Sequence, residues 1–143
     1  MDVVAELVAP CPPEALFAWV DDLERYPEWL EIVTSVAPLP DAAWAVDLRG
    51  RLGPLARSKR LRMVRSPSSG PLTARFERAE LDGRDHSPWV LDAVVTAQGD
   101  RSQLRMVLHY GGGLFGPVLE RVLRDEIERS RLRLLDLVSN PAA

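Results

Sequence analysis

The strongest constraint on the fold is a long helical pattern at the C-terminal end of the chain. Residues 114–138 carry one proline, Pro117, near the start of the segment, where a helix tolerates it. At about 100° per residue, most apolar residues of the segment fall on one face of a helix. These are Phe115, Leu119, Val122, Leu123, Ile127, Leu134, Leu137 and Val138. Because such a face must be buried, the helix has to lie against the rest of the chain.

The chain before this helix is dominated by strand patterns. Seven runs read as strands, over residues 3–9, 32–39, 44–52, 57–65, 72–77, 89–97 and 104–110, and side chains of two kinds alternate most clearly in 44–52, 72–77, 89–97 and 104–110. Alternation with period two is typical of strands, and glycine, proline, aspartate and serine residues form turns between these runs. One apolar and one polar face per strand predict an antiparallel sheet with water on one side.

Two short helices are expected between the first two strands. Pro12-Pro13-Glu14 begins the first, since proline suits the first turn and an acidic residue suits the positive end of the helix dipole. Tyr26-Pro27 should interrupt it, because the residue before proline avoids the helical region, and a further short turn follows. Aromatic residues beside such a break are usually core residues. We therefore assign the aromatic cluster of Tyr26, Pro27 and Trp29 with Trp19 to the core rather than to a cofactor site.

Composition narrows the class of protein. The chain has 143 residues, a length that suits one domain over residues 1–143. Its net charge of −3 argues against nucleic-acid binding, because nucleic-acid-binding domains are strongly basic. No apolar run reaches the roughly 18 residues of a membrane helix, and no signal peptide is visible. One cysteine, Cys11, excludes an internal disulfide, and no spacing gathers three metal ligands, so we expect no metal and no other cofactor. Every basic residue except Lys59 is arginine, a bias typical of GC-rich genomes, so we expect a cytoplasmic bacterial protein.

Two stretches of the sequence resemble a known superfamily. Residues 9–30, which begin Ala9-Pro10-Cys11 and end Trp29-Leu30, resemble the opening of START-like (SRPBCC) proteins. Residues 108–117 are similar to the last strand and closing helix of that superfamily, and its polyketide cyclase/dehydrase and lipid-transport group is the most similar. The resemblance implies an α+β helix-grip fold. In it, a strand, two short helices and a six-strand meander form a curved antiparallel sheet around the long C-terminal α-helix, with a cavity between sheet and helix.

We therefore expect a mostly apolar cavity of about 300–1,000 Å³ that takes a small hydrophobic molecule. The candidate ligand-binding residues are those expected to face it from the sheet and from the helix. They are Arg78, Trp89, Leu91, Met106, Leu108, Tyr110, Leu119, Val122, Leu123, Glu126 and Ser130.

Glu126 and Ser130 interrupt the apolar face of the long helix. A carboxylate in an apolar cavity costs several kcal/mol unless it is paired, neutralised or hydrated. In one interpretation both side chains face the cavity and orient a polar group of the ligand. In the other, the helix is slightly rotated, Glu126 extends to the cavity mouth and Ser130 only leaves room for packing. Arg78 and Glu80 share the parity of the apolar residues of their strand, so they either point inward, at a polar end of the cavity, or turn outward at a bulge.

Binding or transport of a lipid or polyketide-like molecule without catalysis is the leading functional hypothesis. The alternative is an enzyme of the polyketide cyclase/dehydratase type, in which Glu126, Ser130, Arg78 or His86 assists enolisation or loss of water. General acid–base catalysis needs a positioned donor and acceptor, and the sequence shows no convergent set of titratable groups. We therefore assign no catalytic residue, and His86 fits a surface loop better.

A basic stretch gives a third hypothesis, an interaction surface. Its residues are Arg49, Arg51, Arg57, Lys59, Arg60, Arg62 and Arg65, with no acidic residue among residues 49–65. Such a face suits an acidic protein or a peripheral contact with an anionic membrane, or it is simply the solvated side of two strands. Leu132 and Leu135 lie off the apolar arc of the long helix and could meet a second chain, so both a monomer and a homodimer stay open. Gly111–Gly113 predict a flexible corner between the last strand and the helix.

Overall fold

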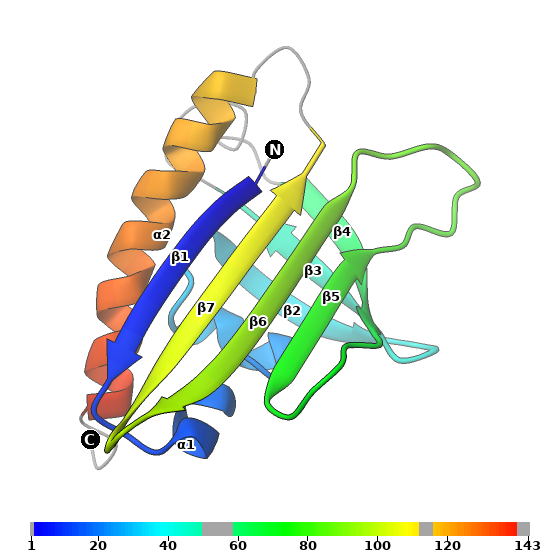
Figure 1. Cartoon of the computed structure of the whole chain (residues 1–143). Helices are drawn as coiled ribbons and strands as arrows, with labels where there is room; N and C mark the ends of the chain where they lie inside the picture. Colours follow the sequence, from blue (N-terminus) through cyan, green and yellow to red (C-terminus); the bar gives the residue numbers. More distant parts are fainter. Residues whose placement is uncertain (1, 50–58, 112–115, 140–143) are drawn as a thin grey trace.

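A strongly bent antiparallel sheet and a long C-terminal helix make up most of the fold (Figure 1). The computed structural model describes residues 2–49, 59–111 and 116–139, and for 116–119 only the backbone. The strands are β1 (Asp2–Ala9), β2 (Val33–Leu39), β3 (Ala43–Leu48), β4 (Lys59–Ser66), β5 (Thr73–Arg78), β6 (Trp89–Gln98) and β7 (Arg101–Tyr110). The helices are α1 (Pro13–Phe17), the 3₁₀ helix η1 (Leu23–Glu28) and α2 (Gly116–Ser139).

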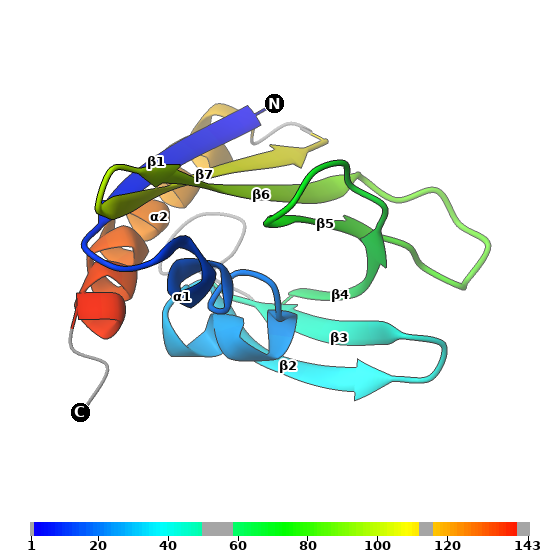
Figure 2. The same cartoon turned by 60° about the horizontal axis from the view of Figure 1, so that its bottom comes forward.

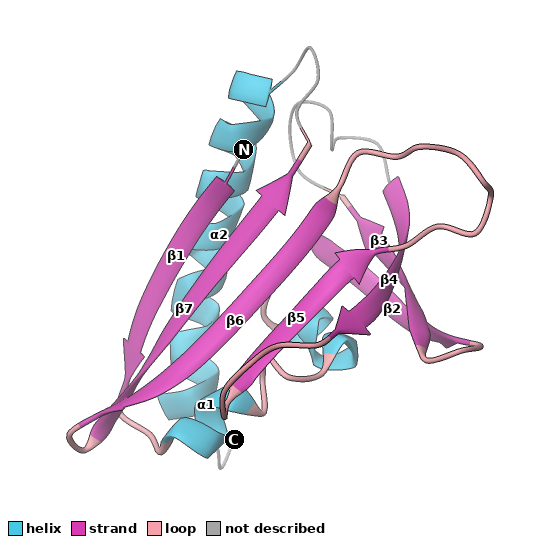
Figure 3. Ribbon diagram, turned by 45° about the vertical axis from the view of Figure 1, so that its right-hand side comes forward, coloured by secondary structure: helices cyan, strands magenta, loops and turns pink. Residues whose placement is uncertain are grey.

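In the described part of the chain, the strands form one sheet in the order β1-β7-β6-β5-β4-β3-β2, and every neighbouring pair is antiparallel. The sheet bends so that β1, β7 and β6 lie opposite β4, β3 and β2, while α2 lies beside β1 (Figure 2). Helix α1 packs against β6 and β7, at the end of the molecule where α2 also ends (Figure 3). The predicted helix-grip arrangement is confirmed, with a sheet that stays open between β1 and β2.

The first helical region differs from the expectation. Helix α1 ends at Phe17, well before Tyr26, and η1 is a separate helix that contains Pro27. The Tyr26 hydroxyl donates a hydrogen bond to the carbonyl oxygen of Val20 at 2.8 Å, and Trp29 Nε1 donates to the carbonyl oxygen of Trp19 at 3.0 Å. These side chains satisfy carbonyl groups that a continuing helix would use, so the helix stops and the chain folds back over its end.

The interior is built around aromatic residues from the short helices and the sheet. Tyr26 is fully buried, and its ring centroid lies 5.0 Å from that of Trp29 and 6.3 Å from that of Phe76. Trp19, by contrast, is half-buried, and the Arg25 guanidinium lies 3.7 Å above its ring. The predicted core position is therefore confirmed for Tyr26 and Trp29, but only in part for Trp19. The rings of Tyr26 and Trp29 occupy the space between the two halves of the bent sheet.

Candidate functional site

A cavity of about 100 Å³ lies between the sheet and α2. Side chains from both halves of the sheet, from η1 and the residues after it, and from α2 line it. Its position agrees with the expectation, but its volume is below the expected range of about 300–1,000 Å³. One reason is that Tyr26, Trp29 and Trp89 contribute bulky rings to the wall.

Five of the predicted site residues line this cavity. They are Trp89 and Leu91 of β6, Met106 and Leu108 of β7, and Leu123 of α2. Successive side chains of a strand point to opposite faces, so the alternation in the sequence is enough to place the residues of β6 and β7 on the inner side. Their contact with a ligand stays a prediction.

Five other predicted residues do not line the cavity, and the side chain of Leu119 lies outside the described residues. The five are Arg78, Tyr110, Val122, Glu126 and Ser130. Among the α2 residues whose side chains are described, those that reach the cavity are Leu123, Ile127, Arg131 and Leu134, which recur at i, i+4, i+8 and i+11. The predicted helix face was therefore rotated, and the three α2 residues lie on the flank of this stripe. Tyr110 is fully buried against Trp89, with ring centroids 5.6 Å apart.

Glu126 and Ser130 lie where α2 packs against the segment before β2. Glu126 is 3% exposed, and its Oε1 lies 2.6 Å from Arg129 Nη2. Arg129 Nε also lies 3.3 Å from Glu31 Oε2. The Ser130 hydroxyl donates to the carbonyl oxygen of Glu126 at 2.7 Å and accepts from the backbone N–H of Glu31 at 3.0 Å. Neither sequence-based interpretation describes these residues, because both side chains are buried in contacts within the protein.

Arg78 lies on the inner face of the sheet, as the inward alternative has it, although it does not line the cavity. It is paired with Met63, which lines the cavity, and residues opposite each other in antiparallel strands share a face. Its side chain is 9% exposed, and Nε donates to Glu80 Oε2 at 2.7 Å. Arg78 Nη2 lies 3.2 Å from His86 Nδ1, and His86 Nε2 lies 2.8 Å from Asp82 Oδ2. Because a guanidinium group only donates, His86 Nδ1 accepts, which leaves Nε2 to donate to Asp82.

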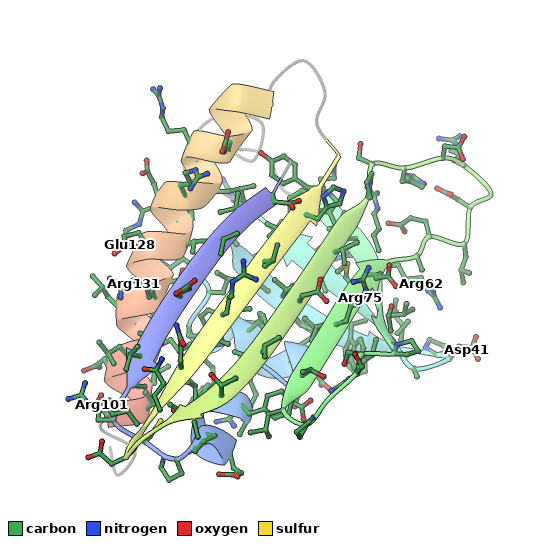
Figure 4. All side chains as sticks on the ribbon, in the orientation of Figure 1. Asp41, Arg62, Arg75, Arg101, Glu128 and Arg131 are labelled. Atoms are coloured by element: carbon green, nitrogen blue, oxygen red, sulfur yellow. The ribbon has the colours of Figure 1, made fainter. Side chains whose placement is uncertain are left out.

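Arg131 lines the cavity but was not among the residues predicted from the sequence. Its spacing from Leu123 fits the cavity-facing stripe of α2, but its charge excluded it from an apolar face. Arg131 Nη2 lies 2.7 Å from Glu128 Oε1, and both side chains project from α2 (Figure 4). Arginine can cover apolar surface with its aliphatic stem while its charged end reaches water. Helical spacing, taken without regard to charge, is the signal that could have identified it.

Two arginines of the basic stretch are paired with acidic residues. Arg60 Nε lies 2.7 Å from Asp47 Oδ1, and Arg65 Nη2 lies 2.5 Å from Asp21 Oδ1. Arg51 and Arg57 lie outside the described residues. These pairs weaken the positive field that an acidic protein or an anionic membrane would need. The interaction-surface hypothesis therefore gains no support from this part of the sheet.

Replacing Arg60 tests this pairing. Hydrogen bonds from Arg60 and Ser35 lower the pKa of Asp47 from 3.8 to about 2. In Arg60→Met we expect that pKa to move back toward 3.8, because the larger of the two hydrogen-bond contributions is lost. A lowered carboxyl pKa adds stability above about pH 4 that is lost as the pH falls toward about 2, so the variant should lose less stability over that acid range. An NMR titration of the Asp47 carboxyl carbon measures the pKa, and a value that stays near 2 would contradict the pairing.

Solved structures with the same fold include a START superfamily protein. A START superfamily protein from Mycobacterium smegmatis is similar at a TM-score of 0.74 and 15% identity, over 98% of each chain. TTHA0849 from Thermus thermophilus has a TM-score of 0.69 and 21% identity, over 100% of both chains. The Zhui aromatase/cyclase from a Streptomyces species has a TM-score of 0.69 and 12% identity, over 100% of this chain and 96% of that one. At these identities the similarity shows the fold alone, which is that of a START-like helix-grip protein.

The sequence also identifies the family. Residues 1–138 match the family described as polyketide cyclase / dehydrase and lipid transport, so the chain belongs to this family. Among curated protein sequences, none is significantly similar to this chain. In the described part of the chain, no helix combines the length and apolar character needed to cross a membrane. The same residues contain no group of three His, Cys, Asp or Glu side chains placed to share a metal ion. Family and fold together support hydrophobic ligand binding or a polyketide cyclase-like role.

Proposed function

We propose that the protein binds or transports one small hydrophobic molecule, of lipid or polyketide type, in the cavity between the sheet and α2. The observation that carries this proposal is the chemistry of the wall. Of the described residues that line it, only Glu6 and Arg131 are charged. The polar groups of Tyr26 and Trp29 are already hydrogen-bonded to backbone carbonyl oxygens. Such a wall offers apolar contact area with few polar groups, as ligand cavities usually do.

The size of the cavity limits what it can hold without rearrangement. A cavity of about 150 Å³ is enough for benzene. At about 100 Å³, this one takes only part of a lipid or polyketide chain. A longer ligand therefore requires α2 or the short helices to move outward, and it favours the conformation in which they have moved.

Catalysis receives less support than binding. A cyclase or dehydratase needs a proton donor and acceptor aimed at the substrate. Tyr26 lines the cavity, but its proton is donated to the carbonyl oxygen of Val20, and burial holds its pKa far above the ordinary value. The candidates from the sequence, Glu126, Ser130, Arg78 and His86, lie outside the cavity wall. We therefore favour binding or transport without catalysis, in the cytoplasm as the sequence led us to expect.

A cavity-filling variant tests the proposal. Ala5 lines the cavity from β1, and Ala5→Leu adds three carbon atoms to the free space. We expect Ala5→Leu to weaken binding of the neutral fluorescent probe N-phenyl-1-naphthylamine by about tenfold, which corresponds to about 1.4 kcal/mol. Stability should hold or rise by about 0.5–2 kcal/mol, because the variant fills a void.

The matched control is Ala97→Leu, at an exposed position near the end of β6. It adds the same carbon atoms outside the cavity, so it should leave probe binding unchanged. Equal probe affinity in the native protein and in Ala5→Leu would rule out binding in this cavity. Mass spectrometry of an organic extract of the purified protein would then identify any ligand that copurifies with it.

A further inference from the structure

Two cations lie at one end of the cavity, on the inner side of the sheet. Across neighbouring strands, Lys59 is paired with Leu48, and Arg78 is paired with Met63. Leu48 and Met63 line the cavity, and paired residues of antiparallel strands point to the same face. The side chains of Lys59 and Arg78 are therefore on the cavity side, although neither lines the cavity.

Trp89 connects Lys59 to the cavity. The Trp89 side chain is part of the wall, and Lys59 Nζ lies 5.9 Å from its ring centroid. Burial, and then the charge of Arg78, lower the pKa of Lys59, and the charge of Glu80 opposes them only in part. Within the described residues, Lys59 Nζ has no hydrogen bond and no ion pair. A half-buried ammonium group beside a second cation, with no anion of its own, is unfavourable in the empty protein.

Arg78, in contrast, already has a carboxylate. Glu80 Oε2 accepts from Arg78 Nε at 2.7 Å and from the backbone N–H of Arg62 at 3.2 Å. Lys59 and Arg78 together carry two positive charges, and Glu80 carries one negative charge, which leaves a net charge of +1. One further carboxylate would neutralise these three side chains and give Lys59 a charge-assisted hydrogen bond.

We propose that the ligand is an amphiphile with a carboxylate head. Its apolar chain occupies the cavity, and its head passes Trp89 to pair with Lys59 beside Arg78. This inference rests on the proposed function and names the class of its ligand. The one cation among the described wall residues, Arg131, is paired with Glu128 at 2.7 Å, so it has less need of an anion from the ligand.

Competition between a matched acid and alcohol tests the proposal. Decanoic acid and decanol have the same chain length, and each is used to displace N-phenyl-1-naphthylamine from the protein. We expect the acid to bind at least about tenfold more tightly than the alcohol to the native protein. Lys59→Met keeps an unbranched side chain and removes its charge, so the acid should lose that advantage while decanol keeps its affinity. Lys59→Arg should restore most of the preference.

Two further measurements separate a ligand contact from a structural role. Arg60→Met is the matched control, because Arg60 is the next residue of β4 and its side chain is 71% exposed. This variant should leave both affinities unchanged. In the empty protein, Lys59→Met should unfold at the same or a higher urea concentration than the native protein, because it removes an unfavourably placed charge. A lysine that is needed for the fold would lower the urea midpoint.

The outcomes distinguish this proposal from the one it rests on. The carboxylate proposal is wrong if the acid fails to displace the probe, if acid and alcohol bind the native protein equally, or if the preference survives in Lys59→Met. It is also wrong if Arg131→Met, rather than Lys59→Met, abolishes the preference. In each of these cases the cavity still binds the neutral probe. If the probe itself does not bind, the proposed function fails as well.

Discussion

Replacing Arg129 with leucine should destabilise the protein by about 3 kcal/mol at neutral pH. Glu126 is 3% exposed and has its ion pair with Arg129 at 2.6 Å, so the variant leaves a buried carboxylate without a cation. We expect the lower end of the range for buried pairs, because 39% of the Arg129 side chain is exposed. Arg129 also pairs with Glu31. Without Arg129, the carboxylates of Glu126 and Glu31 would therefore lie near each other with no positive charge between them.

Urea unfolding at neutral pH measures this effect. Glu126→Gln removes the buried charge itself, so it should cost less than Arg129→Leu. In the double variant, the cost of Arg129→Leu should also fall.

Arg124→Leu is the matched control for this experiment. Arg124 lies on the same helix and pairs with Glu120 at 2.8 Å, but 56% of its side chain is exposed. An exposed pair of this kind contributes about 0.3–0.5 kcal/mol. If the Arg124 and Arg129 variants lose the same stability, Glu126 does not behave as a buried charge.

The order of the elements could be predicted because each pattern reports on local structure. Alternation over residues 89–97 and 104–110 predicted β6 and β7 to within a few residues of their ends. The apolar face of residues 114–138 predicted that α2 covers the sheet. Both patterns depend only on which side of an element is buried, and that is decided by the residues of the element itself.

The rotation of α2 about its axis could not be predicted in the same way. Glu126 and Ser130 lie close to the apolar face, so their spacing fits either a cavity or another part of the protein. The contacts with Glu31, a residue far away in the sequence, distinguish the two. Its backbone N–H donates to the Ser130 hydroxyl, and its carboxylate pairs with Arg129. Helical spacing carries no information about such a partner. A polar residue on a mostly apolar face therefore indicates burial, but not what it is buried against.

The position of Lys59, in contrast, could have been predicted from the sequence, because the strand alternation indicates it. Its positive charge favoured a different interpretation. Lys59 alternates with Leu61 and Met63, and this parity places its side chain on the inner face. By its charge alone, Lys59 belongs with the arginines of the basic stretch, residues 49–65. Parity is set by the backbone and applies to charged and apolar residues alike. A lysine in phase with core residues is therefore better treated as a candidate site residue than as part of a charged surface.

A methyl group at Gly111 should destabilise the protein by about 2 kcal/mol. The sequence predicted a flexible corner here, but the structure gives this glycine a steric reason. A Cβ atom at Gly111 would lie 2.5 Å from Pro88 Cδ and 3.2 Å from Pro88 Cγ. A proline ring is closed onto its own backbone and cannot rotate away, so the start of β6 or the end of β7 has to move. Such a movement would also strain the hydrogen bond from the Gly111 N–H to the carbonyl oxygen of Pro88, which is 2.9 Å long.

The double variant Gly111→Ala/Pro88→Ala tests whether this close contact is the cause. Replacing Pro88 removes the ring atoms that a methyl group would meet, so Gly111→Ala should cost less in that background than in the native protein. Gly111 and Pro88 flank Tyr110 and Trp89, whose rings stack at the Lys59 end of the cavity. Gly111→Ala alone should therefore also change the near-ultraviolet circular dichroism of the folded protein, and Pro88→Ala should reverse much of that change. Urea unfolding of the two single variants and the double variant gives the coupling free energy between Gly111 and Pro88. An equal cost of Gly111→Ala in both backgrounds would show that Pro88 does not exclude a side chain at Gly111.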